Sequence, residues 1–372
     1  MRERDERGSR DDEDIHMGAD KDHHRRRSGL PSRRLIIFAV ASLCVALLLL
    51  HRTFLSDSVT SLKEKPCRSS STRPTTAMLP SPPVAWAAAT HLIMVAGHAV
   101  YMAPSRSEAE VVKEESWWLE SFQHGQLSTM LAHIRRGVEL AAADNHSLLV
   151  FSGGETRVAA GPRSEASSYW EAADALGWFG TPHVRERALL EAHARDSLEN
   201  LLFALCRFYE VAGRYPERVS VVSFGFKRRR FVELHRRALR LPRSRFEYVG
   251  IDPPGLSLDV LAGELSHSSK PFERDPYGCA EVELRRKRAT RDPFRRGARY
   301  ADGCPALGAL LEHCEPSVFR GPLPWSAHVG DDEDVEGGAS GSSGSRRRHL
   351  ASLAAEHGVA RTARDYDASR VA

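Results

Sequence analysis

Short apolar runs alternate with segments of helical periodicity between residues 88 and 325 of this chain. Runs with the length and composition of buried strands lie at 91–97, 147–151, 184–191, 219–224 and 246–251. The segments between them repeat apolar residues at helical spacing, which predicts helices over 117–143, 164–178, 196–212 and 228–241. Strands that alternate with helices form a mainly parallel sheet covered on both faces, so we predict an α/β three-layer sandwich over residues 88–325.

The residues before this domain have a different pattern. Residues 1–34 mix acidic and basic side chains with few apolar ones, which predicts a disordered cytosolic tail. Residues 35–50 contain no charged side chain, and residues 51–55 extend this run to about the 20 residues that cross a bilayer. We therefore predict a transmembrane anchor over residues 35–55, with a cleaved signal peptide as the alternative.

Two further segments flank the domain. Residues 56–87 are rich in Ser, Thr and Pro, which is typical of an extended linker or stalk. Residues 326–372 carry an acidic run, a Gly/Ser run and an arginine triplet, and they predict a second disordered tail.

The charges around the apolar run predict its orientation. Arginines cluster before the run, at Arg25, Arg26, Arg27, Arg33 and Arg34, and fewer charges follow it. The positive-inside rule then leaves the N-terminus in the cytosol. We predict a single-pass type II membrane protein of the secretory pathway (endoplasmic reticulum or Golgi), with the domain in the lumen.

A lumenal domain permits glycosylation and disulfide bonds. Asn145 begins a glycosylation acceptor sequence in a polar turn. Among the six cysteines, we expect Cys206 on a helix face to be a buried free thiol. Cys279, Cys304 and Cys314 lie in the loop-rich final third, where Cys279 with Cys304 is the pairing we favour, although sequence alone does not fix connectivity.

The overall charge bears on the class of partner. The chain has 53 Lys and Arg residues against 49 Asp and Glu residues, a net charge of +4. A nearly balanced chain lacks the basic excess of a nucleic-acid-binding protein, so we expect no nucleic-acid partner. The oligomeric state does not follow from this pattern.

Polar residues of unusual chemistry follow the carboxyl ends of the predicted strands. The candidate ligand-binding residues are Gly97, Ser152, Gly153, Gly154, Arg157, Asn200, Lys227 and Arg230. The candidate catalytic residues are His98, Glu165, Asp196 and Glu199. Because ligands bind at this edge of an open parallel sheet, we predict that these residues surround one hollow. Glycine amides and basic side chains there would hold an anion, while the carboxylates and His98 would act in acid/base chemistry or bind a divalent cation.

Several of these residues also have a structural interpretation. The pair Gly153-Gly154 is common in tight turns. Asp196 followed by Glu199 matches a helix capping box. The basic residues 227–230 open a predicted helix, where a bound anion or a solvated turn explains them. His235 falls on the inward side of that helix, where we favour a buried core histidine over a catalytic one.

The order of these motifs resembles the DUF218 domain family (SanA/YdcF-like), and specifically its eukaryotic membrane-anchored branch. The resemblance covers roughly residues 90–325 and rests on Gly97-His98, Ser152-Gly153-Gly154, Ser164-Glu165-Ala166, Asp196-Ser197-x-Glu199-Asn200 and Phe226-Lys227-x-x-Arg230-Phe231. Bacterial relatives carry a His-containing segment where this chain has residues 226–230.

The resemblance implies a Rossmann-like α/β fold and two classes of function. One bacterial relative is associated with S-adenosylmethionine binding, and others with cell-envelope integrity and lipid-linked glycan processing. The first hypothesis is a lumenal enzyme acting on an anionic phosphate-bearing substrate, such as a nucleotide or a lipid-linked sugar. The second is a non-catalytic sensor or scaffold that binds a nucleotide or S-adenosylmethionine. The cofactors implied by the resemblance are S-adenosylmethionine or a divalent cation.

Overall fold

The computed structural model describes residues 84–297 and 300–326. The predicted tail at 1–34, the anchor at 35–55, the linker up to residue 83 and the second tail from residue 327 lie outside the described residues, and the last four residues of the predicted linker form a helix, α2 (Val84–Ala87). Among the residues that are described, no helix combines the length and the apolar character needed to cross a membrane.

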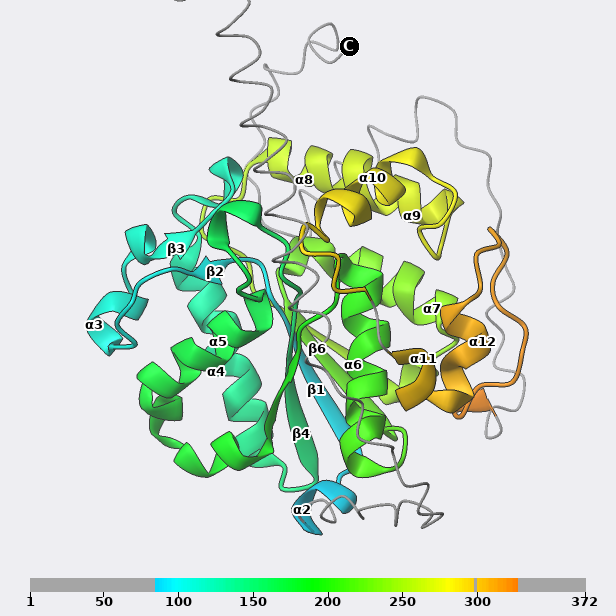
Figure 1. Cartoon of the computed structure of the whole chain (residues 1–372), viewed down its shortest axis with the longest axis horizontal. Coiled ribbons are helices and arrows are strands. Elements are labelled where there is room, and N and C mark those ends of the chain that lie inside the picture. The colour runs from blue at the N-terminus through cyan, green and yellow to red at the C-terminus, as the bar shows by residue number, and fades with distance from the viewer. Residues whose placement is uncertain (1–83, 298–299, 327–372) are drawn as a thin grey trace, which may run out of the picture. The chain divides into compact units, whose positions relative to one another are not determined.

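A five-stranded parallel sheet forms the centre of the domain (Figure 1). In spatial order its strands are β5 (Ala188–Glu191), β4 (Ser147–Ser152), β1 (His91–Ala96), β6 (Arg218–Ser223) and β7 (Phe246–Gly250). Each neighbouring pair is parallel. The chain first adds β4 and β5 on one side of β1 and then adds β6 and β7 on the other. The strand order therefore reverses between β1 and β6, which is where open sheets of this kind bind ligands.

Alternate residues of the strands pack into two hydrophobic cores, one on each face of the sheet. Ile93 and Val95 face the helices α4 (Leu127–Ala143) and α5 (Glu165–Ala175). Leu92 and Met94 face α6 (Ser197–Ala212) and α7 (Arg236–Ala238). The prediction of an α/β domain with a parallel sheet and helices on both faces is confirmed (Figure 1).

The helix predicted over 117–143 begins only at Leu127. Its first residues instead form β3 (Trp117–Trp118), which pairs with β2 (Val100–Tyr101) in an antiparallel ribbon. Trp117 is buried against the ring of Tyr101 at 5.2 Å, and its indole N–H donates to the carbonyl of Val111 at 2.8 Å. These contacts favour the extended conformation over a longer helix.

Two other predicted elements differ in detail. The strand predicted over 184–191 is limited to β5, because Pro182–Arg187 forms a 3₁₀ helix that begins with a proline. The helix predicted over 228–241 consists of a π-helical turn, Arg230–His235, followed by the short α7. The type of each element was predicted correctly at its core, and the boundaries were not.

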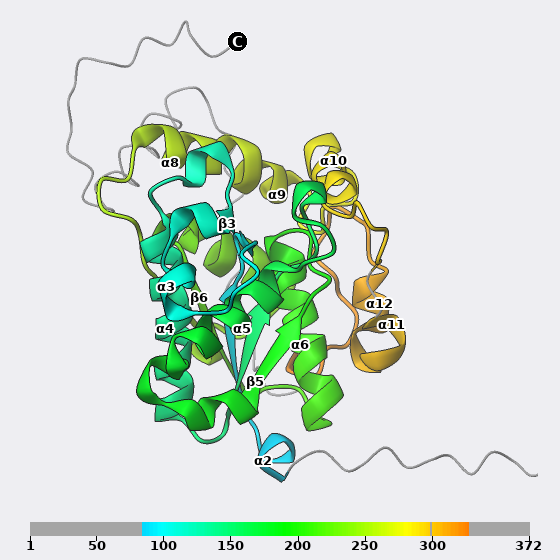
Figure 2. The same cartoon turned by 60° about the vertical axis from the view of Figure 1, so that its left-hand side comes forward.

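A layer of helices lies across the carboxyl ends of the strands, at the end of the sheet opposite α2 (Val84–Ala87) (Figures 1 and 2). It contains α8 (Leu258–Glu264), α9 (Lys270–Arg274) and α10 (Val282–Thr290), and a π-helical turn joins α8 to α9. The remaining short helices are α3 (Glu108–Val111), α11 (Tyr300–Gly303) and α12 (Gly308–Leu311). The sequence predicted a loop-rich final third. These helices do not stand out in the sequence because most of them are short and α10 has only a narrow apolar face.

Two disulfide bonds hold the final third of the domain, one to α6 and one within the final third itself. Cys206 on α6 is bonded to Cys304, and Cys279 is bonded to Cys314. The favoured pairing of Cys279 with Cys304 and the free thiol at Cys206 are therefore both wrong. Cys206 faces the core on α6, and the sequence does not show that α11 packs against that helix.

Candidate functional site

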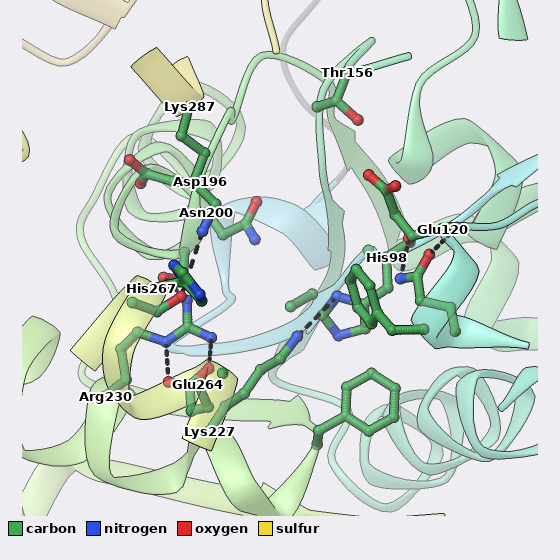
Figure 3. Close-up of a pocket in the computed structure, with 18 of the residues that line it drawn as sticks. His98, Glu120, Thr156, Asp196, Asn200, Lys227, Arg230, Glu264, His267 and Lys287 are labelled. Atoms are coloured by element: carbon green, nitrogen blue, oxygen red, sulfur yellow. Dashed lines mark hydrogen bonds and ion pairs between the residues drawn. The ribbon is translucent and has the colours of Figure 1, made fainter. Parts of the chain in front are cut away.

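A cavity of about 520 Å³ opens at the carboxyl ends of the strands, and residues of α8 and α10 form part of its lining (Figure 3). Residues after β1 and β6 form part of its wall, so it lies where the strand order reverses. Its charged side chains are Glu120, Arg157, Glu165, Arg195, Asp196, Lys227, Arg230, Asp259, Glu264, Lys287 and Arg291. Its apolar side includes Phe122, Phe224, Phe226, Phe231 and Val260.

Most of the predicted site residues line this one cavity. The residues on its wall are Gly97, His98, Arg157, Glu165, Asp196, Asn200, Lys227 and Arg230. They come from segments that are far apart in the sequence, so the structure brings them together as the sheet topology predicted. Four other predicted residues lie behind the wall: Ser152, Gly153, Gly154 and Glu199.

The glycine turn does not present its amides to a ligand. The N–H of Gly153 donates to the carbonyl of Glu191 at 2.9 Å, and the N–H of Gly154 donates to the carbonyl of Ala194 at 2.8 Å. The Ser152 hydroxyl donates to the Glu191 carboxylate at 2.6 Å. The predicted anion cradle at this turn is therefore wrong, since each donor already has a partner in the protein.

The glycines instead make room for Glu165. A Cβ atom placed on Gly97 or Gly153 would lie 2.7 or 2.8 Å from the Cβ of Glu165, closer than carbon atoms pack. Glu165 begins α5, and its carboxylate accepts a hydrogen bond of 2.6 Å from the Thr156 hydroxyl. Two strand ends and one hydroxyl thus hold a buried carboxylate at the cavity wall.

Asp196 caps α6, which confirms half of the predicted capping box, while the Glu199 carboxylate accepts from the Arg195 amide and not from that of Asp196. Its carboxylate accepts from the amides of Leu198 and Glu199, both at 3.0 Å. The second oxygen of Asp196 lies 2.6 Å from Nε of Arg288 on α10. Burial alone would raise the pKa of Asp196, but the Arg288 guanidinium more than offsets this effect and the pKa is lowered.

Glu199 is committed to arginines in the same way. One carboxylate oxygen lies 2.6 Å from Nη2 of Arg195 and 3.4 Å from Nε of Arg288, and the other accepts from the Arg195 amide at 2.8 Å. Among the described residues, no group of three or more His, Cys, Asp or Glu side chains is placed to hold a metal ion. Asp196 and Glu199 serve in this structure as ion-pair partners that fix α10 to the start of α6.

Two of the predicted anion-binding arginines are also paired. Nη1 of Arg157 lies 2.7 Å from a carboxylate oxygen of Glu120. Arg230 and Glu264 form a two-point contact, with Nε to Oε1 at 2.8 Å and Nη2 to Oε2 at 2.9 Å (Figure 3). Carboxylates already neutralise these two guanidinium groups.

Three other cations on the wall lack such a partner. Within the part of the chain that the structure describes, neither Lys227, Lys287 nor Arg291 forms an ion pair with a carboxylate. Nζ of Lys227 lies 3.4 Å from Nδ1 of His98, Nζ of Lys287 lies 3.4 Å from the Ser268 hydroxyl, and Arg291 donates to a backbone carbonyl. The lining carries six cations against five carboxylates, and these three cations are the ones that no carboxylate of the described residues holds in a direct ion pair.

The pKa values of the two lysines reflect this charge. Burial and the neighbouring Arg230 lower the pKa of Lys227 from 10.5 to about 7. Burial and the neighbouring Arg291 lower the pKa of Lys287 to about 8. A nearby anion would favour the protonated form of both amines.

The two histidines singled out from the sequence have different environments. His98 lines the cavity, with Nε2 at 3.0 Å from the Ser223 hydroxyl, and burial together with Lys227 lowers its pKa well below the usual range. His235 is fully buried between aromatic rings, with Nε2 at 2.7 Å from the Ser197 hydroxyl. The interpretation of His235 as a core residue is confirmed.

The sequence reasoning missed Lys287, Arg291 and Glu264. These residues come from α10 and α8, in the region that we interpreted as loop-rich. One signal was present: Leu284, Lys287 and Arg291 are spaced to share one helix face, and Leu284 is buried. An apolar residue at helical spacing from Lys287 and Arg291 predicts that the helix face carrying these two basic residues points toward the domain.

One relative of similar sequence is a Saccharomyces cerevisiae protein, YOR238W, whose printed name describes it as uncharacterized. It is 26% identical to this chain over 296 residues, which span 63% of this chain and 97% of the yeast protein. No family model and no solved structure matches the chain. The name of this relative carries no activity, so the cavity is the basis for assigning one.

Proposed function

We propose that this domain binds a phosphate-bearing small molecule in the cavity. The observation that carries the proposal is the set of three cations, Lys227, Lys287 and Arg291, that share the cavity without carboxylate partners. Enclosing uncompensated charge is unfavourable, and a phosphate group that accepts charge-assisted hydrogen bonds offsets this penalty.

The sheet supports a Rossmann-like domain of the DUF218 type. The cavity lies at the reversal of strand order, which is the usual ligand position in such sheets. Of the motifs that carry the resemblance, Gly97-His98, Glu165, Asp196, Asn200, Lys227 and Arg230 contribute to the wall. We assign the proposed ligand to this family site.

The charge of the cavity favours a phosphate ligand over S-adenosylmethionine. The sulfonium of that cofactor is itself positive and gains nothing from three unpaired cations. A phosphate monoester or diphosphate carries the opposite charge and matches the amine and guanidinium donors of Lys227, Lys287 and Arg291. The apolar wall of Phe122, Phe226 and Val260 would contact the remainder of the ligand.

Enzymatic turnover and binding without chemistry are both compatible with a phosphate site. Two of the predicted acid/base groups, Asp196 and Glu199, are paired with arginines, which favours binding alone. Two others, His98 and Glu165, remain on the wall and would supply acid/base chemistry to an enzyme. Turnover of a stabilising ligand that is lost in Glu165→Gln, with ligand binding intact, would select the enzyme.

The proposed location is the lumen of the secretory pathway, with residues 35–55 as a type II anchor. The two disulfide bonds of the domain support it, because stable disulfides form in oxidising compartments. Asn145 is exposed in its turn, as a glycosylation acceptor must be. Treatment of the native protein with a glycosidase should increase its gel mobility, and Asn145→Gln should remove that change. Accessibility of the domain to cytosolic protease in sealed membranes would contradict this placement.

Thermal unfolding with a panel of anions tests the binding proposal. A ligand at about 100 times its dissociation constant stabilises by about 2.7 kcal/mol, which raises Tm by about 5–10 °C for a domain of this size. We expect this shift with inorganic phosphate, pyrophosphate, a nucleotide or a sugar phosphate.

Lys287→Ala and Arg291→Ala should remove most of the shift. Arg286→Ala is the matched control, because it deletes an exposed cation next to Lys287 on the same helix. Stabilisation by none of these anions, or an equal loss in Arg286→Ala, would overturn the proposed function.

A further inference from the structure

Lysine is rare in this chain, and its distribution is uneven. Of the 53 Lys and Arg residues of the chain, only seven are lysines. The described residues contain four of them, Lys113, Lys227, Lys270 and Lys287, and two of these four line the cavity. An arginine provides a permanent charge and a better fork for phosphate, whereas only lysine can lose its proton near neutral pH. The placement of two of these four lysines in the cavity, in a chain that otherwise uses arginine, points to a role for the amine itself.

Lys227 has the surroundings of a nucleophilic amine. Its Nζ lies 3.4 Å from Nδ1 of His98 and 4.8 and 5.6 Å from the ring centres of Phe224 and Phe226 (Figure 3). In the tautomer that carries its proton on Nε2, His98 donates to the Ser223 hydroxyl, and its Nδ1 is the acceptor that faces the amine. Burial and Lys227 keep this imidazole neutral by lowering its pKa well below the usual range.

The charged and titratable groups around Lys227 come from every element packed against it. They are His98 after β1, His133 of α4, Arg230 of the π-helical turn, Asp252 after β7, Glu264 of α8, Lys287 of α10 and Arg291 at the C-cap of α10. Of the two carboxylates among them, Glu264 is paired with Arg230, and Asp252 accepts from the amide of Phe226 at 3.0 Å. In the empty cavity, with its pKa near 7, about half of the Lys227 amine is unprotonated at neutral pH, against about one part in 3,000 for a lysine with the ordinary pKa of 10.5.

We propose that Lys227 is a nucleophile that forms an imine with the carbonyl group of an anionic aldehyde or ketone bound in this cavity. Recognition of the anionic part rests on the proposed function, with Lys287 and Arg291 as the phosphate-binding pair. Lys227 and Lys287 reach the cavity from different sides in Figure 3. A ligand between them can place its phosphate at Lys287 and its carbonyl group at Lys227.

The chemistry of this step balances without a further reactant. The unprotonated Nζ of Lys227 adds to the carbonyl carbon and forms the C–N bond. His98 Nδ1, in an imidazole that stays neutral, accepts a hydrogen bond from Nζ and orients the amine, and the proton that the nitrogen loses reaches the carbinolamine oxygen through solvent. The C–O bond then breaks, both amine protons leave with that oxygen as water, and the C=N bond remains.

Labelling with pyridoxal 5′-phosphate tests the proposal, because this reagent carries an aldehyde and a phosphate group on one ring. The full chain is incubated with the reagent at pH 7, reduced with borohydride and mapped by mass spectrometry of its peptides. We expect Lys227 to be labelled about tenfold or more over Lys113 and Lys270, because its free-amine fraction is larger. Excess inorganic phosphate should slow the labelling.

Two variants define the control. Lys227→Arg keeps the positive charge and should lose the label, while thermal unfolding verifies that it is folded. Lys270→Arg removes a lysine outside the cavity and should leave the labelling of Lys227 unchanged. Labelling that is uniform over the lysines, or that prefers Lys287, would overturn the assignment of Lys227.

A second comparison separates this inference from the proposed function. Phosphate that stabilises the domain without any labelling of Lys227 would overturn the inference and leave the binding function in place. Equal labelling of Lys227 by pyridoxal and by its phosphate, with no stabilisation by any anion, would support a reactive amine and overturn the phosphate site.

Discussion

Replacing Lys227 with methionine should stabilise the empty domain at neutral pH. The amine lies among Arg230, Lys287 and Arg291 without a carboxylate of its own, and its pKa falls from 10.5 to about 7. A fall of that size corresponds to about 4–5 kcal/mol of unfavourable interaction in the charged form. Because the amine borders a cavity that is open to water, screening reduces the effect, and we expect a gain of about 2 kcal/mol for Lys227→Met.

The pH dependence of this gain follows from proton linkage. Between about pH 7 and pH 10.5 the unfolded chain holds the Lys227 proton and the folded domain does not, so the stability of the wild-type domain rises with pH. Below pH 7 both states are protonated and the penalty is constant. The advantage of Lys227→Met should therefore be largest at pH 6 and should shrink toward pH 9.

Thermal unfolding at pH 6, 7 and 9 measures this difference. A gain of about 2 kcal/mol raises Tm by about 4–8 °C for a domain of this size. The matched control is Arg286→Met, an exposed cation on α10 whose replacement should change stability by less than about 0.5 kcal/mol. A loss of stability in Lys227→Met at pH 7, or a gain that does not vary with pH, would refute the electrostatic reasoning.

Three other changes have outcomes that the structure specifies. Arg288→Ala leaves the buried Asp196 carboxylate without its cation and should cost about 3–5 kcal/mol, and a loss below 1 kcal/mol in denaturant unfolding would contradict this. Gly97→Ala places a Cβ atom 2.7 Å from that of Glu165 and should lower stability by about 1–3 kcal/mol in the same assay, whereas an unchanged midpoint would show that Glu165 yields freely. Sulfate is a dianion from pH 7 to pH 9, so its affinity should fall about tenfold over this interval as Lys287, with a pKa of about 8, loses its proton. A sulfate affinity that does not vary with pH in calorimetric titration would exclude Lys287 as an anion-binding residue.

The sequence was sufficient for the architecture and for the position of the site. Strand-length apolar runs and helical periodicity predicted the five strands, and the parallel order placed Arg157, Glu165, Asp196 and Lys227 at one edge. These features depend on local patterning and on the direction of the strands, both of which can be derived from the order of residues along the chain.

Partner choice could not be predicted in the same way. From the sequence alone, the amides of Gly153 and Gly154 could donate to a ligand. In the structure they donate to the carbonyls of Glu191 and Ala194. Cys206 was an isolated cysteine by sequence until α11 brought Cys304 beside it. Such pairings depend on loop paths that no periodic pattern records, so they require the three-dimensional structure.

The cations of the cavity divide into two groups with different physical roles. Arg157, Arg195 and Arg230 each have a carboxylate within 3 Å, and these pairs hold the walls together. Lys227 and Lys287 lie on the same walls without one. Stability alone would favour a carboxylate partner or an apolar residue at these two positions, and the fold provides carboxylates for three nearby arginines. This unfavourable placement of the two lysines is the physical basis on which we propose a bound anion.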